Sequence, residues 1–258
     1  MQTLILTAPG VITSPLPDHP RLPDLASDLY LDIDPAMISG VADGAAIPSI
    51  IATGSAPIAD RTIAQLVPSV TSRPLYSAAG GPGGVPCLTF EGSHGVSNDY
   101  NDASENWTAG ATYACLFRVR DYLQANDRIY ASVSPLNAEY VNITPVSAPQ
   151  GLSFTAFDGA SVIRTKPTAS TGWQIGVFAL PDVSMAEGHI VLDDASETLA
   201  LPRGSYGGLS LGTVKTIGSG AVGTTLIGDI ARFRIYKRQM TLDECRALVA
   251  VWRDSYGL

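Results

Sequence analysis

From Asp28 to Lys237 the sequence is a succession of short apolar runs, and each run is bounded by Gly, Pro, Asn or Asp. No segment in this span repeats its apolar residues at the helical period over the length that a stable helix needs. The chain contains 25 Gly and 18 Pro, which favour turns over long helices. The sequence therefore predicts an all-β fold, and its 258 residues suit one large domain.

Alternation of apolar and polar residues predicts which faces of the strands are buried. The side chains that we expect to point inward are Tyr113, Cys115, Phe117 and Val119 in one run and Ala231, Phe233 and Ile235 in another. The arginines between them, Arg118, Arg120, Arg232 and Arg234, take the opposite faces. Asp158-Gly159 separates two further apolar runs, 151–157 and 160–164, and predicts a hairpin closed by a tight primed turn.

The C-terminal segment 241–255 is the exception, because its apolar residues recur at helical spacing. Thr241 and Glu244 form a capping box, which marks the start of a helix. The apolar stripe consists of Leu242, Cys245, Leu248, Val249 and Trp252. We expect this stripe to lie against an end or edge of the strand assembly, where the helix would also cover an exposed edge.

The N-terminal residues 1–22 differ in composition from residues 23–258, which we predict to form the domain. Prolines at positions 15, 17, 20 and 23 favour extended backbone, so we predict an extended arm. The apolar residues Leu4 to Leu6 could pair with the sheet edge of a neighbouring subunit, or the segment could be an unattached terminus. The arm has no basic region before its apolar run, so we expect no secretion signal.

Charge and cysteine content exclude several classes of partner. The 16 Lys and Arg residues against 24 Asp and Glu give a net charge of −8, so we expect no nucleic-acid partner. No run approaches the roughly 18 apolar residues of a membrane-spanning helix, so we expect no membrane insertion. Cys87, Cys115 and Cys245 are an odd number without C-x-x-C spacing, which indicates buried thiols.

Several motifs together resemble a known family. The closing segment runs from Ile227 through Tyr236 to the capped helix and ends in Trp252 and Tyr256-Gly257. The opening comprises Asp28-Leu-Tyr-Leu-Asp-Ile-Asp, Asp43-Gly44, Arg73-Pro-Leu-Tyr76 and Gly84-Val-Pro-Cys-Leu-Thr-Phe-Glu-Gly92. From about residue 25 to its end, the chain resembles concanavalin A-like lectin/glucanase domains of the laminin-G-like kind. The resemblance implies a jelly roll of two antiparallel sheets. Such domains also occur in phage virion proteins and bacterial exoproteins.

The glucanase branch of this superfamily carries three acids at alternating positions of one strand, so that a nucleophile and a proton donor share a face. Here only Asp32 and Asp34 alternate, and Pro35-Ala36 supplies no third acid. We interpret the pair as a strand end followed by an Asp-Pro turn. His189 is interpreted as packed or half-exposed, and loop residue His94 as a ligand contact or simply exposed. We therefore expect no enzyme.

Residues 97–105 concentrate oxygen-bearing side chains of the kind that calcium binds. The candidate calcium ligands are Asp99, Asn101 and Asp102, with a merely solvated loop as the alternative. Exposed aromatic rings stack on pyranoses while amides bind their hydroxyls. The candidate carbohydrate-binding residues are Tyr100, Asn101, Trp107 and Tyr206, although Trp107 could instead pack against the strand near Thr112. Trp173 and Trp252 are interpreted as core residues.

These observations leave two functions open. We expect a non-enzymatic structural or adaptor component of a phage virion, in the capsid, neck or tail, which displays a lectin-like sandwich with host-surface glycan as a candidate ligand. Its partners would then be other virion proteins and further copies of the same chain. The alternative is an extracellular carbohydrate-binding module outside any virion.

Overall fold

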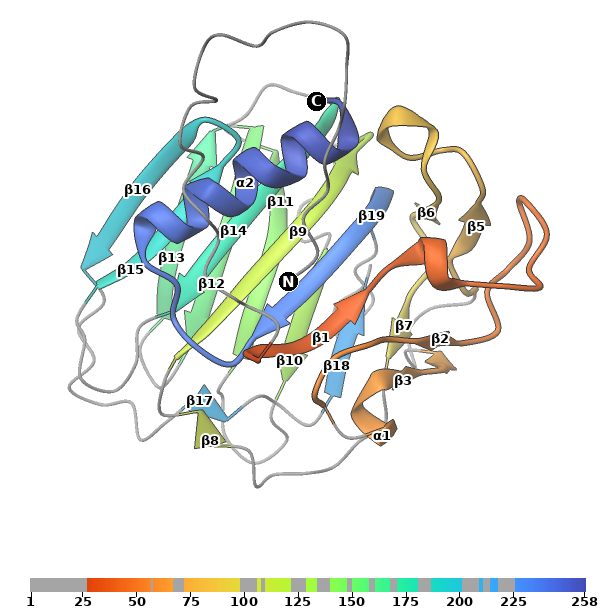
Figure 1. Cartoon of the computed structure of the whole chain (residues 1–258), viewed down its shortest axis with the longest axis horizontal. Coiled ribbons are helices and arrows are strands. Elements are labelled where there is room, and N and C mark those ends of the chain that lie inside the picture. Colours follow the sequence, from red (N-terminus) through yellow and green to blue (C-terminus); the bar gives the residue numbers. More distant parts are fainter. Residues whose placement is uncertain are drawn as a thin grey trace, which may run out of the picture.

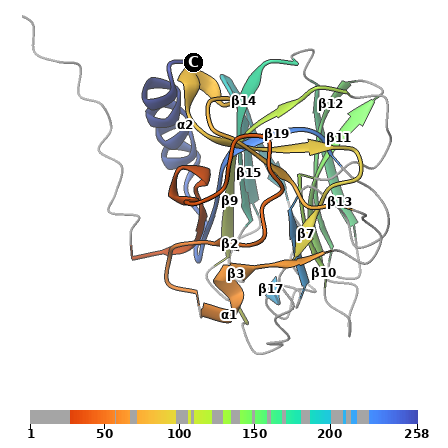
Figure 2. The same ribbon diagram turned by 90° about the vertical axis from the view of Figure 1, so that its right-hand side faces the viewer.

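The computed structural model describes residues 27–56, 58–66, 72–97, 106–107, 110–121, 129–133, 140–147, 150–157, 161–167, 171–180, 187–200, 209–210, 214–217 and 226–258. Within these residues, two antiparallel sheets face each other and one long helix lies on the outside of the first sheet (Figure 1). Figure 2 shows the helix, the first sheet and the second sheet as successive layers. The predicted arm, residues 1–22, lies outside the described residues.

The first sheet, called here the helix-side sheet, has eight strands in the described part of the chain. Their order is β16 (Ala195–Ala200), β15 (Glu187–Leu192), β14 (Trp173–Leu180), β9 (Ala111–Val119), β19 (Ile227–Tyr236), β6 (Cys87–Glu91) and β5 (Leu75–Ser77), and β1 (Leu29–Ile33) also pairs with β19. Strand β9 follows one edge of β19. The other edge is shared, because β6 pairs with residues 227–230 and β1 with residues 233–236.

The second sheet has seven strands among the described residues. Their order is β13 (Ser161–Pro167), β12 (Gln150–Phe157), β11 (Tyr140–Ser147), β10 (Tyr130–Val133), β18 (Val214–Ile217), β7 (Val96–Ser97) and β4 (Gln65–Leu66). Two short ladders join β17 (Leu209–Ser210) to β8 (Asn106–Trp107) and β2 (Ile50–Ile51) to β3 (Thr62–Ile63). The remaining elements are α1 (Ile58–Arg61), α2 (Leu242–Tyr256) and 3-10 turns at Pro35–Met37 and Pro82–Gly84. The predicted two-sheet antiparallel jelly-roll sandwich with a C-terminal helix is confirmed.

Both faces of the helix-side sheet carry a cluster of buried apolar residues. The inner face contributes to a core that also contains Val96 of β7 and Ile129 beside β10, and the predicted inward residues Tyr113, Cys115, Phe117 and Val119 all lie in it. The outer face forms a second cluster with the helix: Ala114, Leu116, Ile175, Val177 and Val191 pack with Cys245, Leu248, Val249 and Trp252. Helix α2 therefore covers a face of the sheet, above β14 and β15 (Figure 1), and the prediction that it lies at an end or edge was wrong.

A β-bulge in β19 changes which side chains point inward. Ile230 is opposite Phe117 of β9, but the next register pair is Arg232 with Leu116, so Ala231 is the extra residue of the bulge. Ala231 consequently packs in the helix-side cluster, whereas Phe233 and Ile235 lie in the inner core. The prediction was correct for the latter two residues and wrong for Ala231, because strict alternation does not allow for an inserted residue.

The predicted hairpin of residues 151–164 is present as β12 and β13. Phe157 pairs with Ser161 across the two strands, so three residues connect the paired positions. The predicted two-residue turn at Asp158-Gly159 would instead pair Phe157 with Ala160. The hairpin was therefore predicted correctly and its register was wrong by one residue.

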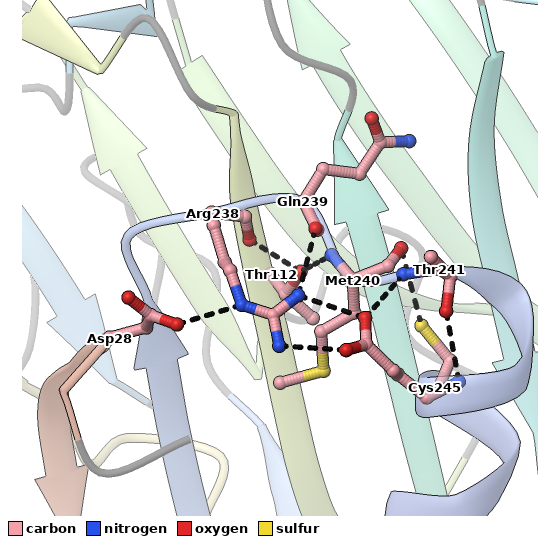
Figure 3. A network of polar contacts seen from close by, with 8 residues as sticks. Asp28, Thr112, Arg238, Gln239, Met240, Thr241 and Cys245 are labelled. Carbon is pink, nitrogen blue, oxygen red and sulfur yellow. Dashed lines mark hydrogen bonds and ion pairs between the residues drawn. The ribbon is translucent and has the colours of Figure 1, made fainter. Parts of the chain in front are cut away.

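Polar contacts fix the start of α2 on the sheet (Figure 3). The capping box is present: the Glu244 amide donates to Thr241 Oγ1 at 3.3 Å, and the Thr241 amide donates to Glu244 Oε2 at 2.8 Å. Arg238 then bridges Glu244 and Asp28, with Nη1 2.8 Å from Glu244 Oε2 and Nε 2.8 Å from Asp28 Oδ2. Buried Thr112 of β9 accepts from the Met240 amide at 2.9 Å. These contacts thus join the residue before β1, strand β9 and the start of α2.

Candidate functional site

Most of the residues predicted to bind carbohydrate or calcium lie outside the described residues. This applies to Asp99, Tyr100, Asn101, Asp102 and Tyr206. Trp107 is the exception, because the backbone of β8 is described. The structure therefore tests where the strand that carries Trp107 lies, and the proposed ligand contacts stay predictions.

Strand β8 pairs with β17, which comes about a hundred residues later in the chain. Trp107 is opposite Leu209 and Asn106 is opposite Ser210. Tyr206 precedes Leu209 by three positions in the sequence, so the ladder joins the segment of Trp107 to the segment of Tyr206. The β8–β17 ladder lies at the end of the sandwich opposite the C-terminal end of α2 (Figure 1). Strands β8 and β17, which are distant in sequence, are thus adjacent in the fold.

Asp32 of β1 and Asp34, which follows the strand, are held by arginines of β19. Buried Asp32 accepts from Arg232 at both carboxylate oxygens, with Nε at 2.8 Å and Nη2 at 2.6 Å. Asp34 Oδ2 lies 2.6 Å from Arg232 Nη1, and its Oδ1 accepts from the Ala36 amide and caps the turn Pro35–Met37. Arg234 Nε lies 3.0 Å from Asp32 Oδ2. These carboxylates therefore join two strands and cap a turn.

The two histidines in the described residues do not project freely into solvent. His94 is buried, and its Nδ1 accepts a hydrogen bond from the Glu91 amide at 3.2 Å. The interpretation of His94 as an exposed loop residue was therefore wrong, because the tight turn after β6 folds the imidazole back onto the strand. His189 is partly buried beside Thr198, and burial lowers the pKa of its imidazole. Its packed or half-exposed position was predicted.

The three cysteines are buried free thiols, as predicted. Burial raises the pKa of Cys87 to about 11 and that of Cys245 to about 12, and it also raises the pKa of Cys115. A thiol needs a lowered pKa to act as a nucleophile at neutral pH. These thiols are therefore suited to packing and not to covalent chemistry.

Sequence reasoning missed a polar cluster on the outer face of the helix-side sheet. This Asp229 cluster consists of Thr89, Glu91, Arg118, Arg120, Trp173 and Asp229. The Asp229 side chain is only 3% exposed. Its carboxylate accepts from Thr89 Oγ1 at 2.9 Å and from Arg118 Nε at 2.9 Å. Arg120 Nε lies 3.3 Å from the same carboxylate.

Trp173 lies at the edge of this cluster and not in the core. Its ring is half-buried, and the Arg118 guanidinium carbon lies 5.0 Å from the ring centroid. The core assignment was correct for Trp252, which is 4% exposed, and wrong for Trp173. Trp173 is the first residue of β14 and the one residue of that strand that is not fully buried. The sequence signal for the cluster is Asp229, an acid within an otherwise apolar strand.

Two kinds of site are not found in the described part of the chain. No three His, Cys, Asp or Glu side chains there are grouped so that they could hold a metal ion. No helix there has the length and apolar character to cross a membrane.

No family model and no curated protein sequence matches this chain. Solved structures that share its fold include the following three. Domain 4 of AbnA, a GH43 extracellular arabinanase from Geobacillus stearothermophilus, solved in complex with arabinotriose, has a TM-score of 0.54 at 11% identity and covers 86% of this chain and 99% of its own. The binding domain of Paraclostridial Mosquitocidal Protein 1 has a TM-score of 0.60 at 10% identity, over 88% of this chain and 53% of its own.

The third is the binding domain of botulinum neurotoxin serotype G, with a TM-score of 0.54 at 11% identity, over 76% of this chain and 49% of its own. This chain thus spans about half the length of each toxin chain and nearly all of the arabinanase domain. At these identities the likeness concerns the fold. The chain has the β-sandwich fold that these three structures share.

Proposed function

We propose that this chain is a non-catalytic, concanavalin A-like carbohydrate-binding domain whose saccharide site lies at the β8–β17 ladder. The observation that carries the proposal is the pairing of Trp107 with Leu209, which joins the two segments that hold the candidate aromatic residues. A saccharide site needs aromatic faces for the sugar rings and polar groups for the hydroxyls. Tyr100, Asn101, Trp107 and Tyr206 supply both kinds of group from these segments.

Calcium is the proposed cofactor of this site. Asp99, Asn101 and Asp102 offer carboxylate and amide oxygens, which are the donors that calcium takes in proteins. They lie in the same short segment as Tyr100. A bound calcium ion would order this segment beside the sugar.

The fold comparisons support a binding role. One neighbour, domain 4 of the arabinanase, was solved with arabinotriose, and it matches along nearly its whole length. The two toxin neighbours are themselves binding domains. In addition, Asp32 and Asp34 are neutralised by Arg232, so neither is placed as a free acid for glycoside hydrolysis.

We further propose that the domain is displayed on a phage virion as a structural or adaptor protein, in contact with other virion proteins and with copies of itself. The resemblance to laminin-G-like modules of virion proteins and the proline-rich arm support this role. An extracellular carbohydrate-binding module is the alternative. Deletion of residues 1–22 tests the role: assembly should fail while the melting temperature of the domain stays nearly unchanged, and normal assembly of the truncated chain would contradict the arm as anchor.

A glycan array on the purified full chain, followed by calorimetry on the best neutral ligand, tests the carbohydrate proposal. Trp107→Ala should weaken binding at least about tenfold, because the loss of one stacked ring removes on the order of 1 kcal/mol or more. Trp107→Phe keeps a ring and serves as the matched control, with most of the affinity retained. Equal affinity of both variants and the wild type would contradict a site at β8–β17.

A further inference from the structure

We infer that the Asp229 cluster is a second saccharide site, selective for sugars that carry a carboxylate, such as uronic acids. The inference rests on the proposed carbohydrate-binding function and adds to it a ligand class and a separate location. No residue of the cluster belongs to the β8–β17 ladder.

The cluster is a row of side chains across four adjacent strands. In register, Thr89 of β6 is opposite Asp229 of β19, and Asp229 is opposite Arg118 of β9. Arg118 is in turn opposite Trp173 of β14. Side chains opposite each other on neighbouring strands project from the same face of a sheet. The row therefore presents a hydroxyl, a carboxylate, a guanidinium and an indole along one line of the outer face.

This row lies just beyond the end of helix α2. The last residue of the helix, Tyr256, accepts at its hydroxyl from Arg232 Nη1 at 3.4 Å. Arg232 is opposite Leu116, which lies two residues before Arg118 on β9. The helix thus covers the sheet up to the level of Leu116. The next outward-facing residues, those of the Asp229 cluster, form a polar surface that is called here the polar shelf. On it the side chains of Arg118 and Arg120 are 33% and 34% exposed.

The buried carboxylate of Asp229 fixes the orientation of the guanidinium groups of Arg118 and Arg120. It holds Arg118 by Nε and Nη2, at 2.9 and 2.7 Å, and Arg120 by Nε at 3.3 Å. Arg120 Nη2 is also fixed, by the Phe90 carbonyl at 2.9 Å and by Glu91 at 2.8 Å. Among the described residues, the hydrogen bonds and ion pairs of these two arginines involve Nε and Nη2 and not Nη1. Both guanidinium groups are therefore fixed in position, and the N–H groups at their Nη1 atoms can donate to a ligand.

The two guanidinium groups and the neighbouring indole together favour an anionic ligand that carries a sugar ring. Guanidinium groups bind carboxylates through paired, charge-assisted hydrogen bonds. Two guanidinium groups share one buried carboxylate, and only the half-exposed Glu91 balances the second charge from the rim. The indole of Trp173 borders the same shelf: Arg118 covers one face of the ring, and the part of the partly buried side chain that stays exposed is the apolar surface available to a sugar ring. An acidic sugar can use both groups: its carboxylate accepts hydrogen bonds from Nη1 of the arginines, and its pyranose ring lies against Trp173.

Calorimetric titration of the full chain with trigalacturonic acid, and with galactotriose as the neutral probe, tests the inference. We expect the acidic probe to bind and the neutral one to bind this shelf at least about tenfold more weakly. Raising the salt concentration should weaken only the acidic probe, since charge attraction is screened. Absence of heat and of any change in melting temperature with about 10 mM trigalacturonic acid would overturn the inference.

Three variants locate the binding. Arg118→Lys keeps a charge beside Asp229 but removes the outward Nη1, and it should weaken the acidic probe about tenfold or more. Arg120→Gln should do the same, and Arg246→Gln on the exposed face of α2 should not. Melting temperatures verify that each variant is folded. Unchanged affinity in Arg118→Lys and Arg120→Gln, or loss of the acidic probe through Trp107→Ala alone, would overturn this site, and the latter result would still support the site at β8–β17.

Discussion

Asp32 of β1 binds Arg232 of β19 through both carboxylate oxygens, at 2.8 and 2.6 Å, across 200 residues of sequence. The Asp32 side chain is 5% exposed and that of Arg232 is 18% exposed. Because β1 pairs with only residues 233–236 of β19, this ion pair fastens the first strand to the residue of β19 that directly precedes the paired segment. The alternating acids Asp32 and Asp34 thus serve here to join the first strand and the turn after it to β19.

Asp32→Asn should therefore lower the free energy of unfolding by about 3 kcal/mol, because it removes the buried carboxylate that Arg232 and Arg234 share and leaves only Asp34 beside Arg232. Chemical denaturation would measure the change as a lower midpoint at an unchanged slope. Asp254→Asn, on the exposed end of α2, is the matched control and should alter stability by less than about 0.5 kcal/mol. Equal midpoints for the two variants would contradict the structural role of Asp32.

The capping box makes stability depend on acid pH. The hydrogen bonds from Arg238, and then those from Thr241, lower the pKa of Glu244 below its ordinary value of 4.5. A carboxyl whose pKa is lower in the folded state stabilises the protein above its unfolded pKa, and this contribution is lost as the pH falls through the folded pKa. Stability from Glu244 should thus be fully present at neutral pH and decline below about pH 4.5.

Comparison of Glu244→Gln with the wild type over this pH range tests the capping-box prediction. The variant should be about 1 kcal/mol less stable at pH 7, and the difference should shrink towards pH 3. Asp243→Asn changes a neighbouring acid that is 93% exposed and should show a much smaller pH-dependent difference. A difference for Glu244→Gln that stays constant from pH 7 to pH 3 would contradict the assignment.

Gly228 is required by close packing between β19 and β9. A Cβ atom at this position would lie 2.2 Å from the Arg118 carbonyl oxygen and 3.2 Å from Leu226 Cδ1. Gly228→Ala should therefore force the strands apart and destabilise the fold by about 2 kcal/mol or more. At Gly84 a Cβ meets nothing within 4 Å, although its φ is +80°, so Gly84→Ala isolates the cost of backbone strain at about 1 kcal/mol. If Gly84→Ala is the more damaging change in thermal unfolding, the crowding argument fails.

The fold could be predicted from local patterns because its strands and its helix each carry their own signal. The alternation of Tyr113, Cys115 and Phe117 identified the inner face of β9, and Thr241 with Glu244 identified the start of α2. Such signals depend on neighbours in sequence. The position of α2 on the sheet does not, because it follows from the second apolar face of β9 and β14, which alternation leaves ambiguous when both faces are buried.

The same distinction between local sequence signals and long-range pairing applies to the candidate sites. Aromatic and acidic residues near Trp107 are visible in the sequence, but the pairing of β8 with β17 arises from chain reversals that no local pattern records. The Asp229 cluster was missed because its members come from four strands and meet only through register. Trp173 was assigned to the core for the same reason, since its strand is buried everywhere except at its first residue.

The last prediction concerns calcium. If Asp99, Asn101 and Asp102 bind calcium, the ion should bind the folded chain more tightly than the unfolded chain and raise its melting temperature. At a Kd near 1 mM, typical of extracellular modules, about 10 mM calcium stabilises the fold by roughly 1.4 kcal/mol.

Differential scanning calorimetry with and without calcium measures this shift. Asp99→Asn and Asp102→Asn should each reduce the shift, because each removes one negative ligand while keeping an oxygen in place. Asp243→Asn, an exposed acid on α2, should leave it intact. Calcium should also strengthen neutral-glycan binding at β8–β17 and leave the acidic probe at the Asp229 cluster unaffected, since only the former site adjoins the calcium ligands in sequence. A melting temperature that does not respond to about 10 mM calcium would show that the loop is solvated and holds no ion.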